Sequence, residues 1–191
     1  MLTRICLVRH AETEWNRLDR LQGHQDLPLN DRGRAQAREA AARVRGEDWD
    51  AIVSSPLRRA TQTARIVAQV VGVPFVGVDP LLIERSYGVA AGLTPTELDR
   101  RYVDGDVPGM ESRADVASRG LTAMQRLYVE RAGQRVLAIT HGSLVKCVLL
   151  WLRPDLPAAS LDVTLLSATV VEWDGFEWSV RVVGTQLGNK R

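Results

Sequence analysis

Short apolar segments alternate with longer helix-like segments along most of the chain. The segments that predict strands are Arg4 to Val8, Ala51 to Val53 and Arg135 to Thr140, and the stretch at 74–78 is also expected to be extended. Strands that alternate with helices form a mostly parallel sheet with helices on both faces. We therefore expect an α/β fold, a three-layer α/β/α sandwich around a mostly parallel central sheet.

The expected helices have recognisable ends. Asn30 or Asp31 is a candidate N-cap and Gly46 a candidate C-cap of the first long helix, and Ser55 and Gly72 flank the second. Further helices are expected at 95–102, 113–131 and 143–152, and two final strands at 163–173 and 177–183.

Composition places the chain among ordinary soluble globular proteins. Its 191 residues are 45% hydrophobic and 25% charged, which suits a single domain spanning residues 1–191. A net charge of +2 argues for neither nucleic acid nor a membrane surface as a partner. The longest apolar stretch, Cys147 to Leu152, is too short to cross a bilayer, and no signal pattern opens the chain. We expect a cytoplasmic protein whose two cysteines are buried free thiols.

Polar residues follow three of the expected strands at the point where each strand ends. They are Arg9-His10 after the first strand, the segment 54–59 after the second, and His141-Gly142-Ser143 after the strand at 135–140. Ligands of open α/β sheets bind beyond the carboxyl ends of the strands. The topology alone therefore brings two of the three histidines of the chain to one rim.

Two arginines in the first turn of a helix are electrostatically unusual. Arg58 and Arg59 lie where the helix dipole disfavours cations, and an anion bound at that helix start would remove the conflict. Helical spacing puts Arg58 on a polar face and Arg59 on a face that becomes apolar. We therefore expect Arg58 to be solvated and Arg59 to point inward.

Histidines and arginines at one rim indicate an oxyanion site, and phosphate is the favoured anion. A neutral imidazole can attack phosphorus and form a phosphoenzyme. Arginines can neutralise the charge on the equatorial oxygens during the transfer. A carboxylic acid would then protonate the leaving oxygen.

Five segments of the chain resemble the histidine phosphatase superfamily, also called the phosphoglycerate mutase-like superfamily. LVRHAETEWN is similar to its Arg-His-Gly-Glu-[Ser/Thr]-x-x-Asn signature, and RLQGHQDLPLNDRGRAQA to the segment that follows. SSPLRRATQTA, LLIERSYG and ITHGS resemble the family's arginine, acidic and second-histidine segments. The five occur in the family's order at suitable spacings and cover nearly the whole chain.

The resemblance implies a catalytic role for five residues. His10 corresponds to the nucleophile that becomes phosphohistidine, and Glu84 to the acid that protonates the leaving group. Arg9, Arg59 and His141 correspond to the phosphate pocket.

The resemblance also implies four substrate-binding positions, Asn16, Gln22, Gly23 and Gly142. No metal-ligand cluster is visible in the sequence, so we expect no metal, and we expect no cofactor except 2,3-bisphosphoglycerate if the protein is a mutase. Ala11 stands where the family usually has glycine, and it would be strained if that position required a positive φ. For Glu12, Glu14 and Glu111 we expect capping or loop-holding roles, and for His24 no catalytic role.

The resemblance leaves two enzyme classes open. ERSYGVAAGL is closer to the mutase pattern, whereas Thr94-Pro95 replaces the mutase Asn-Lys and only a short loop joins Leu93 to Arg113. Arg100-Arg101 could imitate the paired arginines of a mutase, although a solvated helix face explains them equally well. We favour a metal-independent phosphomonoester hydrolase over a phosphoglycerate mutase. A catalytically silent phosphate-ligand binding domain is a third alternative.

The expected partner is a small phosphorylated metabolite whose identity the sequence does not reveal. We expect specificity to reside in Leu93 to Arg113 and Gln22 to Leu29. A homodimer formed through the last two strands is left open.

Overall fold

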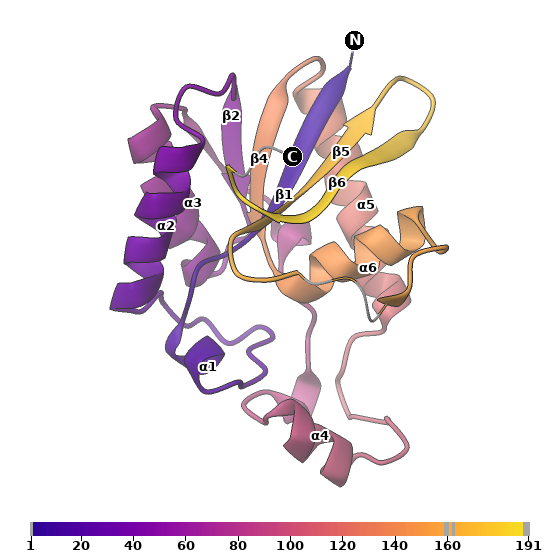
Figure 1. Ribbon diagram of the computed structural model, residues 1–191. Helices are drawn as coiled ribbons and strands as arrows, with labels where there is room; N and C mark the ends of the chain where they lie inside the picture. The colour runs from indigo at the N-terminus through magenta and orange to yellow at the C-terminus, as the bar shows by residue number, and fades with distance from the viewer. Residues whose placement is uncertain (1, 159–160, 162, 189–191) are drawn as a thin grey trace.

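The structure is a computed structural model that describes residues 2–158, 161 and 163–188. A six-stranded sheet in the order β3-β2-β4-β1-β5-β6 runs through the molecule (Figure 1). Its strands are β1 (Thr3–Arg9), β2 (Ala51–Ser54), β3 (Phe75–Val78), β4 (Arg135–Thr140), β5 (Ser167–Trp173) and β6 (Trp178–Gln186).

The sheet is parallel over its first four strands and antiparallel at one side. β3, β2, β4 and β1 pair in parallel, whereas β5 pairs antiparallel with β1 and β6 antiparallel with β5. The predicted α/β fold with a mostly parallel central sheet is confirmed.

Helices cover both faces of the sheet. α2 (Asp31–Arg43) and α3 (Arg58–Val71) pack on one face, and α5 (Arg113–Glu130) and α6 (Gly142–Leu152) on the other (Figure 1). The short helices α1 (Glu14–Arg17) and α4 (Pro95–Arg101) lie beyond the lower end of the sheet as drawn. Two 3₁₀ turns, η1 (Pro80–Leu82) and η2 (Gly88–Ala90), precede α4.

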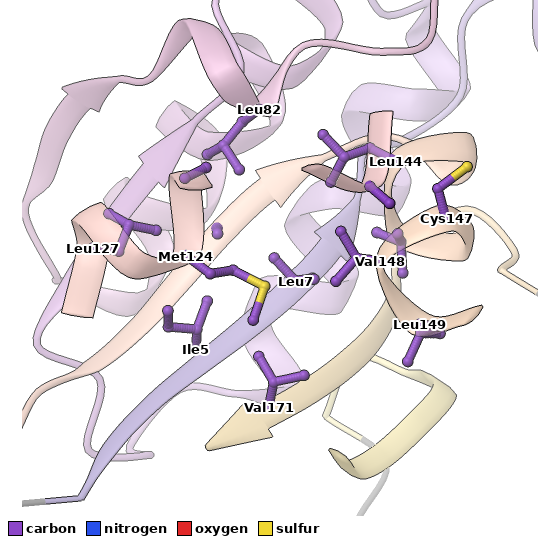
Figure 2. Packing of buried hydrophobic residues seen from close by; sticks show 14 of the residues in the cluster. Ile5, Leu7, Leu82, Met124, Leu127, Leu144, Cys147, Val148, Leu149 and Val171 are labelled. Carbon is purple, nitrogen blue, oxygen red and sulfur yellow. The ribbon is translucent and has the colours of Figure 1, made fainter. Parts of the chain in front are cut away.

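Alternating side chains of β1 divide the hydrophobic core into two layers. Ile5 and Leu7 face α5 and α6, while Cys6 and Val8 face α2 and α3. Figure 2 shows the first layer, in which Ile5 and Leu7 meet Met124 of α5 and side chains of α6. Because side chains on a strand alternate between faces, a continuous apolar run such as β1 is what a strand covered on both faces requires.

Several predicted boundaries are confirmed. The Asn30 side chain caps α2 by accepting a 2.7 Å hydrogen bond from the Gly33 N–H, and Gly72 ends α3 with a φ of +80°. Both cysteines are buried and free. In the described part of the chain, no helix has the length and apolar character needed to span a membrane.

Other predicted boundaries were wrong. α3 begins at Arg58, and its N-cap Leu57 makes no side-chain cap. The Ser55 hydroxyl lies two residues further back, where it contacts His141 and accepts from the Leu57 N–H at 3.3 Å. α2 ends at Arg43, before Gly46. β5 begins at Ser167, not at Val163, since Leu166 has a left-handed φ of +58° and its N–H donates to the Arg9 carbonyl.

The start of α2 lies directly against the chain that follows β1. A Cβ atom placed on Gly33 would lie 2.0 Å from the Glu12 carbonyl oxygen, so only glycine permits this approach. We predict that Gly33→Ala lowers the free energy of unfolding by about 2–4 kcal/mol, although alanine is the better helix former. Urea unfolding measures the change.

Gly120→Ala is the matched control for this prediction. Its new methyl group would meet the side chains of Val148, at 2.5 Å, and Leu144, at 3.6 Å. Because side chains can move aside more easily than a backbone carbonyl, we expect a smaller loss than for Gly33→Ala. If Gly33→Ala is as stable as the parent, α2 does not depend on the close approach.

Candidate active site

Two histidines end neighbouring strands in matched register. β1 and β4 pair in parallel with Arg9 opposite Thr140, so His10 and His141 each follow the last paired residue. The backbone N–H of His10 donates to the Thr140 carbonyl at 2.9 Å. The two imidazole rings lie 5.1 Å apart between centroids. The sheet therefore brings the two histidines together, as the strand ends predicted.

The His10 ring is oriented by its own backbone. Its Nδ1 lies 2.7 Å from the Ala11 carbonyl oxygen. Because a carbonyl only accepts, Nδ1 carries the proton and Nε2 keeps a free lone pair. Burial lowers the pKa of His10 well below its usual value, and the charges of Arg59 and Arg9 lower it further. His10 is therefore a neutral imidazole with an available nucleophilic nitrogen.

His141 is also buried and neutral. Its Nε2 lies 2.7 Å from the Ser55 hydroxyl, while its Nδ1 is buried and has no hydrogen-bond partner among the described residues. Burial lowers the pKa of His141 well below its usual value, and the charge of Arg59 lowers it further. A buried polar atom without a partner has a desolvation cost that a bound ligand could relieve.

Arg59 is completely buried, as the helical spacing predicted, whereas Arg58 is exposed. The Arg59 guanidinium donates to the Gln25 and Gly23 carbonyls at 2.7 and 2.8 Å, and its Nε is buried with no hydrogen-bond partner among the residues that the structure describes. Burial lowers the pKa of Arg59 to about 10, so the group stays charged at neutral pH. The two carbonyl dipoles and the charges of Glu84 and Asp26 stabilise the buried guanidinium, and a bound anion would add to this stabilisation.

Glu84 lies opposite the start of α6. Glu84 is buried, and its carboxylate accepts from the Arg85 N–H at 2.8 Å and from the Ser143 N–H at 3.4 Å. The Tyr87 hydroxyl lies 2.7 Å from the Ser143 hydroxyl. Burial raises the pKa of Tyr87, with the charge of Glu84 adding to the effect, so the phenol remains protonated.

The segment that carries Glu84 is held by side chains outside the site. Arg119 of α5 donates to the Leu81, Ile83 and Glu84 carbonyls and forms an ion pair with Glu111 at 2.7 Å. The His24 ring lies 2.7 Å from the Glu84 carbonyl. Glu111 therefore has a loop-holding role, as predicted, and His24 helps to fix the backbone of Glu84.

A cleft of about 420 Å³ joins the predicted residues. Its lining includes Arg9, His10, Asn16, Gln22, Arg59, Glu84 and Gly142. His141 and Gly23 are outside this lining, and Gly23 acts through its carbonyl, which accepts from Arg59. Asn16 uses its carbonyl oxygen to cap α1 at Thr13, so its amide N–H₂ is the part that could reach a ligand.

Most of the outer wall of the cleft was not predicted. It is formed by Trp15, Asp19, Arg20, Leu21, Tyr87, Ser143, Lys146, Leu161, Val163 and Leu165. Residues 93–113 are outside this lining, and the expectation that this loop sets specificity stays a prediction. Ser143 belongs to the cluster predicted after the strand at 135–140, and Lys146 left a usable signal because it lies one helical turn after Gly142.

Ala11 causes no backbone strain. Asp19 and Leu166 are the non-glycine residues with positive φ in the described ranges, and Ala11 is not among them. Its N–H donates to the Thr63 hydroxyl at 3.2 Å, and its methyl group is buried in the layer against α2 and α3. Alanine therefore fits this position.

A larger cleft of about 600 Å³ lies along β5 and β6 and contains none of the predicted catalytic residues. In the part of the chain that the structure describes, no group of three His, Cys, Asp or Glu side chains is arranged to hold a metal ion.

Comparison with known proteins agrees with this geometry. The family model described as the histidine phosphatase superfamily (branch 1) matches residues 5–186. The chain is 34% identical over 183 residues to the uncharacterised phosphatase PhoE of Bacillus subtilis, covering 94% of this chain and 93% of PhoE. It is also 34% identical over 195 residues to phosphoglycerate mutase-like protein 4 of Arabidopsis thaliana, covering 94% and 84% of the two chains.

Solved structures show the same fold. A mycobacterial glucosyl-3-phosphoglycerate phosphatase, solved as a complex with VO₃, superposes with a TM-score of 0.84 at 29% identity, covering 96% of this chain and 99% of the other.

The two adjacent arginines provide a matched test of the site. We predict that Arg59→Met lowers kcat/KM for an aryl phosphate by at least about 100-fold, because the variant loses a buried cation beside the reacting group. Arg58→Met removes the same charge from the exposed face and should change kcat/KM by less than about threefold. Steady-state kinetics measures both variants, and the opposite ranking would contradict the inward placement of Arg59.

The two neutral histidines predict a dependence of stability on pH. In the unfolded chain each histidine binds a proton below about pH 6.5, whereas the folded chain binds it only at much lower pH. The free energy of unfolding should therefore fall as the pH is lowered from 7 to 5.5, by up to about 1.4 kcal/mol per pH unit for each histidine.

Urea unfolding at several pH values measures this slope. His10→Gln and His141→Gln should each reduce this slope by up to about 1.4 kcal/mol per pH unit, which corresponds to one proton fewer taken up on unfolding. A slope that is unchanged in both variants would show that the histidines are protonated in the folded chain.

Proposed function

We propose that this chain, which belongs to branch 1 of the histidine phosphatase superfamily, is a phosphatase that hydrolyses a small phosphorylated metabolite through a phosphohistidine at His10. The phosphatases among its relatives support this assignment. The observation that carries the proposal is the neutral, oriented imidazole of His10 beside the buried charge of Arg59. The proposal assigns the reaction to a single domain of residues 1–191.

The first step transfers the phosphoryl group to the enzyme. Nε2 of His10 attacks phosphorus, the bond from phosphorus to the ester oxygen breaks, and protonated Glu84 gives its proton to the leaving alkoxide. The hydrogen bond from Nδ1 to the Ala11 carbonyl stabilises the positive charge that develops on the ring.

The second step transfers the phosphoryl group to water. The Glu84 carboxylate takes a proton from the attacking water, the bond from phosphorus to Nε2 breaks, and inorganic phosphate leaves. Both His10 and Glu84 return to their starting protonation states, so one water molecule is consumed for each ester cleaved.

Positive groups around His10 stabilise the transferring phosphoryl group. Arg9 and Arg59 supply fixed charges, and Nδ1 of neutral His141 is available to donate when that nitrogen carries the ring proton. The N–H groups of Gly142 and Ser143 begin α6, where the helix dipole also favours an anion. Because these side chains and dipoles supply the electrostatic stabilisation, we propose that the reaction requires no metal ion or cofactor.

Phosphoglycerate mutase is the alternative, and mutase-like relatives favour it. A mutase must hold the dephosphorylated intermediate and return the phosphoryl group to it. The arginine pair that could serve this purpose, Arg100 and Arg101, is exposed and lies outside the cleft lining. Water is therefore the favoured acceptor, and the cleft supplies competent residues at every catalytic position, which argues against a silent binding domain.

The phosphoenzyme provides the direct test. We predict that rapid quenching during turnover of a ³²P-labelled aryl phosphate in excess EDTA traps an acid-labile, alkali-stable phosphoprotein. His10→Ala should trap none and lose turnover by at least about 10⁴-fold, because no other side chain replaces the nucleophile. Thermal unfolding checks that the variant is folded.

Two outcomes would contradict the proposal. Labelled protein from folded His10→Ala would place the nucleophile elsewhere, and loss of activity in EDTA that Mg²⁺ restores would show that the reaction needs a metal. A separate experiment distinguishes the two enzyme classes. In ³¹P NMR of 3-phosphoglycerate with a trace of 2,3-bisphosphoglycerate, a mutase forms 2-phosphoglycerate and a phosphatase releases phosphate.

A further inference from the structure

One arginine of α5 makes contacts all along the backbone that leads to Glu84. The guanidinium of Arg119 donates to three carbonyls of this short segment, at 2.8, 2.5 and 3.1 Å, which belong to Leu81, Ile83 and Glu84. It also donates to both carboxylate oxygens of Glu111, at 2.7 and 3.0 Å. A guanidinium has five N–H groups, and each of them has one of these acceptors. A lysine, with three donors on one nitrogen, could not make the same set of contacts.

The peptide group between Glu84 and Arg85 connects this arginine to the carboxylate. The Glu84 carbonyl and the Arg85 N–H belong to one planar, rigid unit. At one end of the unit, the carbonyl accepts from Arg119 at 3.1 Å and from the His24 ring at 2.7 Å. At the other end, the Arg85 N–H donates to the Glu84 carboxylate at 2.8 Å. The side chains that hold the carbonyl therefore also set the direction of the N–H that holds the carboxylate.

The carboxylate of Glu84 depends strongly on this N–H. In the described part of the chain, its other hydrogen bond comes from the Ser143 N–H and is longer, at 3.4 Å. Rotation of the 84–85 peptide would break the shorter hydrogen bond and move the carboxylate away from its place in the cleft. A displacement of about 1 Å can lower a rate by about 100-fold.

Glu111 holds Arg119 and the chain on the far side of the same peptide. Its carboxylate accepts from the Ser86 N–H at 3.2 Å, and its backbone N–H donates to the Ser86 carbonyl at 3.0 Å. The Arg119 and Glu111 side chains are only 16% and 19% exposed, so solvent screens their ion pair little. These contacts close the base of residues 87–110, which include α4 (Figure 1), and fix the chain after Glu84 as well as before it.

Resting on the proposed phosphatase function, we propose that Arg119 is a positioning residue that fixes the rotation of the 84–85 peptide and so keeps the Glu84 carboxyl group in place to protonate the leaving oxygen. Arg119 lies outside the lining of the cleft and acts through Glu84. If Arg119 only satisfied backbone carbonyls, its loss would lower stability without changing how the rate depends on the leaving group.

Two aryl phosphates with leaving groups of different basicity test this proposal. p-Nitrophenolate is a weak base that can leave without a proton, whereas the more basic phenolate needs an acid. We expect Arg119→Met to lower kcat/KM by about 10- to 100-fold for phenyl phosphate and by less than about threefold for p-nitrophenyl phosphate. Because kcat/KM includes only the steps up to release of the phenol, hydrolysis of the phosphoenzyme does not affect the comparison.

Arg126→Met is the matched control. Arg126 lies two turns after Arg119 on α5 and pairs with Asp79 at 3.4 Å, away from the 84–85 peptide. This variant should change kcat/KM for both substrates by the same factor, less than about threefold. Equal losses on both substrates in folded Arg119→Met, or a selective loss of the same size in Arg126→Met, would overturn the role of Arg119.

His24→Ala keeps the test decisive if thermal unfolding shows that Arg119→Met does not fold. His24 is exposed, and its ring donates to the same Glu84 carbonyl, so its loss should weaken the hold on the peptide without unfolding the chain. We expect a smaller selective loss, of about 3- to 10-fold for phenyl phosphate alone. Unchanged kinetics in His24→Ala, with Arg119→Met unfolded, would also overturn the proposal.

Glu84→Gln distinguishes failure of this inference from failure of the proposed function. If Glu84→Gln loses more activity on phenyl phosphate than on p-nitrophenyl phosphate but folded Arg119→Met does not, only the Arg119 proposal fails. If Glu84→Gln loses both activities equally, or if the parent enzyme hydrolyses neither ester, the proposed function fails in its acid step or altogether, and Arg119 has no acid to position.

Discussion

The parallel pairing of β1 with β4 is the constraint on which the site depends. Their register places Arg9 opposite Thr140, so the next residue of each strand is a histidine. β2 pairs with β4 on its other side with Ser54 opposite Ile139, which puts Ser55 within 2.7 Å of His141. A slip of one residue would turn these side chains to the opposite faces of the sheet. The hydrophobic faces of the strands therefore fix the relative positions of the catalytic groups.

Burial gives the site both a neutral imidazole and a buried cation. The same loss of solvent lowers the pKa of His10, of His141 and of Arg59, whose charge is stabilised by two carbonyl dipoles and by Glu84 and Asp26. A neutral histidine beside a buried cation is costly in an empty site and favourable once a phosphoryl group arrives. The empty site therefore lowers the stability of the fold, but the charge of Arg59 is already in place for an anion where the strands end.

The parts of the fold that follow from local patterns were predictable. The apolar run of β1 and the helical face of Arg59 depend on neighbours a few residues away, and both emerged from periodicity. α1 was not predicted because its capping box uses Asn16 in place of glutamate or glutamine. The loop before β5 was misread as strand because its apolar residues pack over the carboxyl end of β1, and the left-handed φ of Leu166 is a tertiary effect.

The fold constrains the residues proposed to react more strongly than the residues of the outer wall, which contact the rest of the substrate. His10, His141 and Ser55 are held by strand register, and Gly33 lets α2 pack against the backbone just beyond His10, so these positions tolerate little change. Trp15, Lys146 and Leu165 lie on a four-residue helix, on α6 and on the loop before β5, where a side chain can be replaced without moving a strand. Selectivity can therefore change at the outer wall while the reacting groups stay in place, which explains why a sequence can reveal a phosphoryl-transfer site more readily than the molecule it acts on.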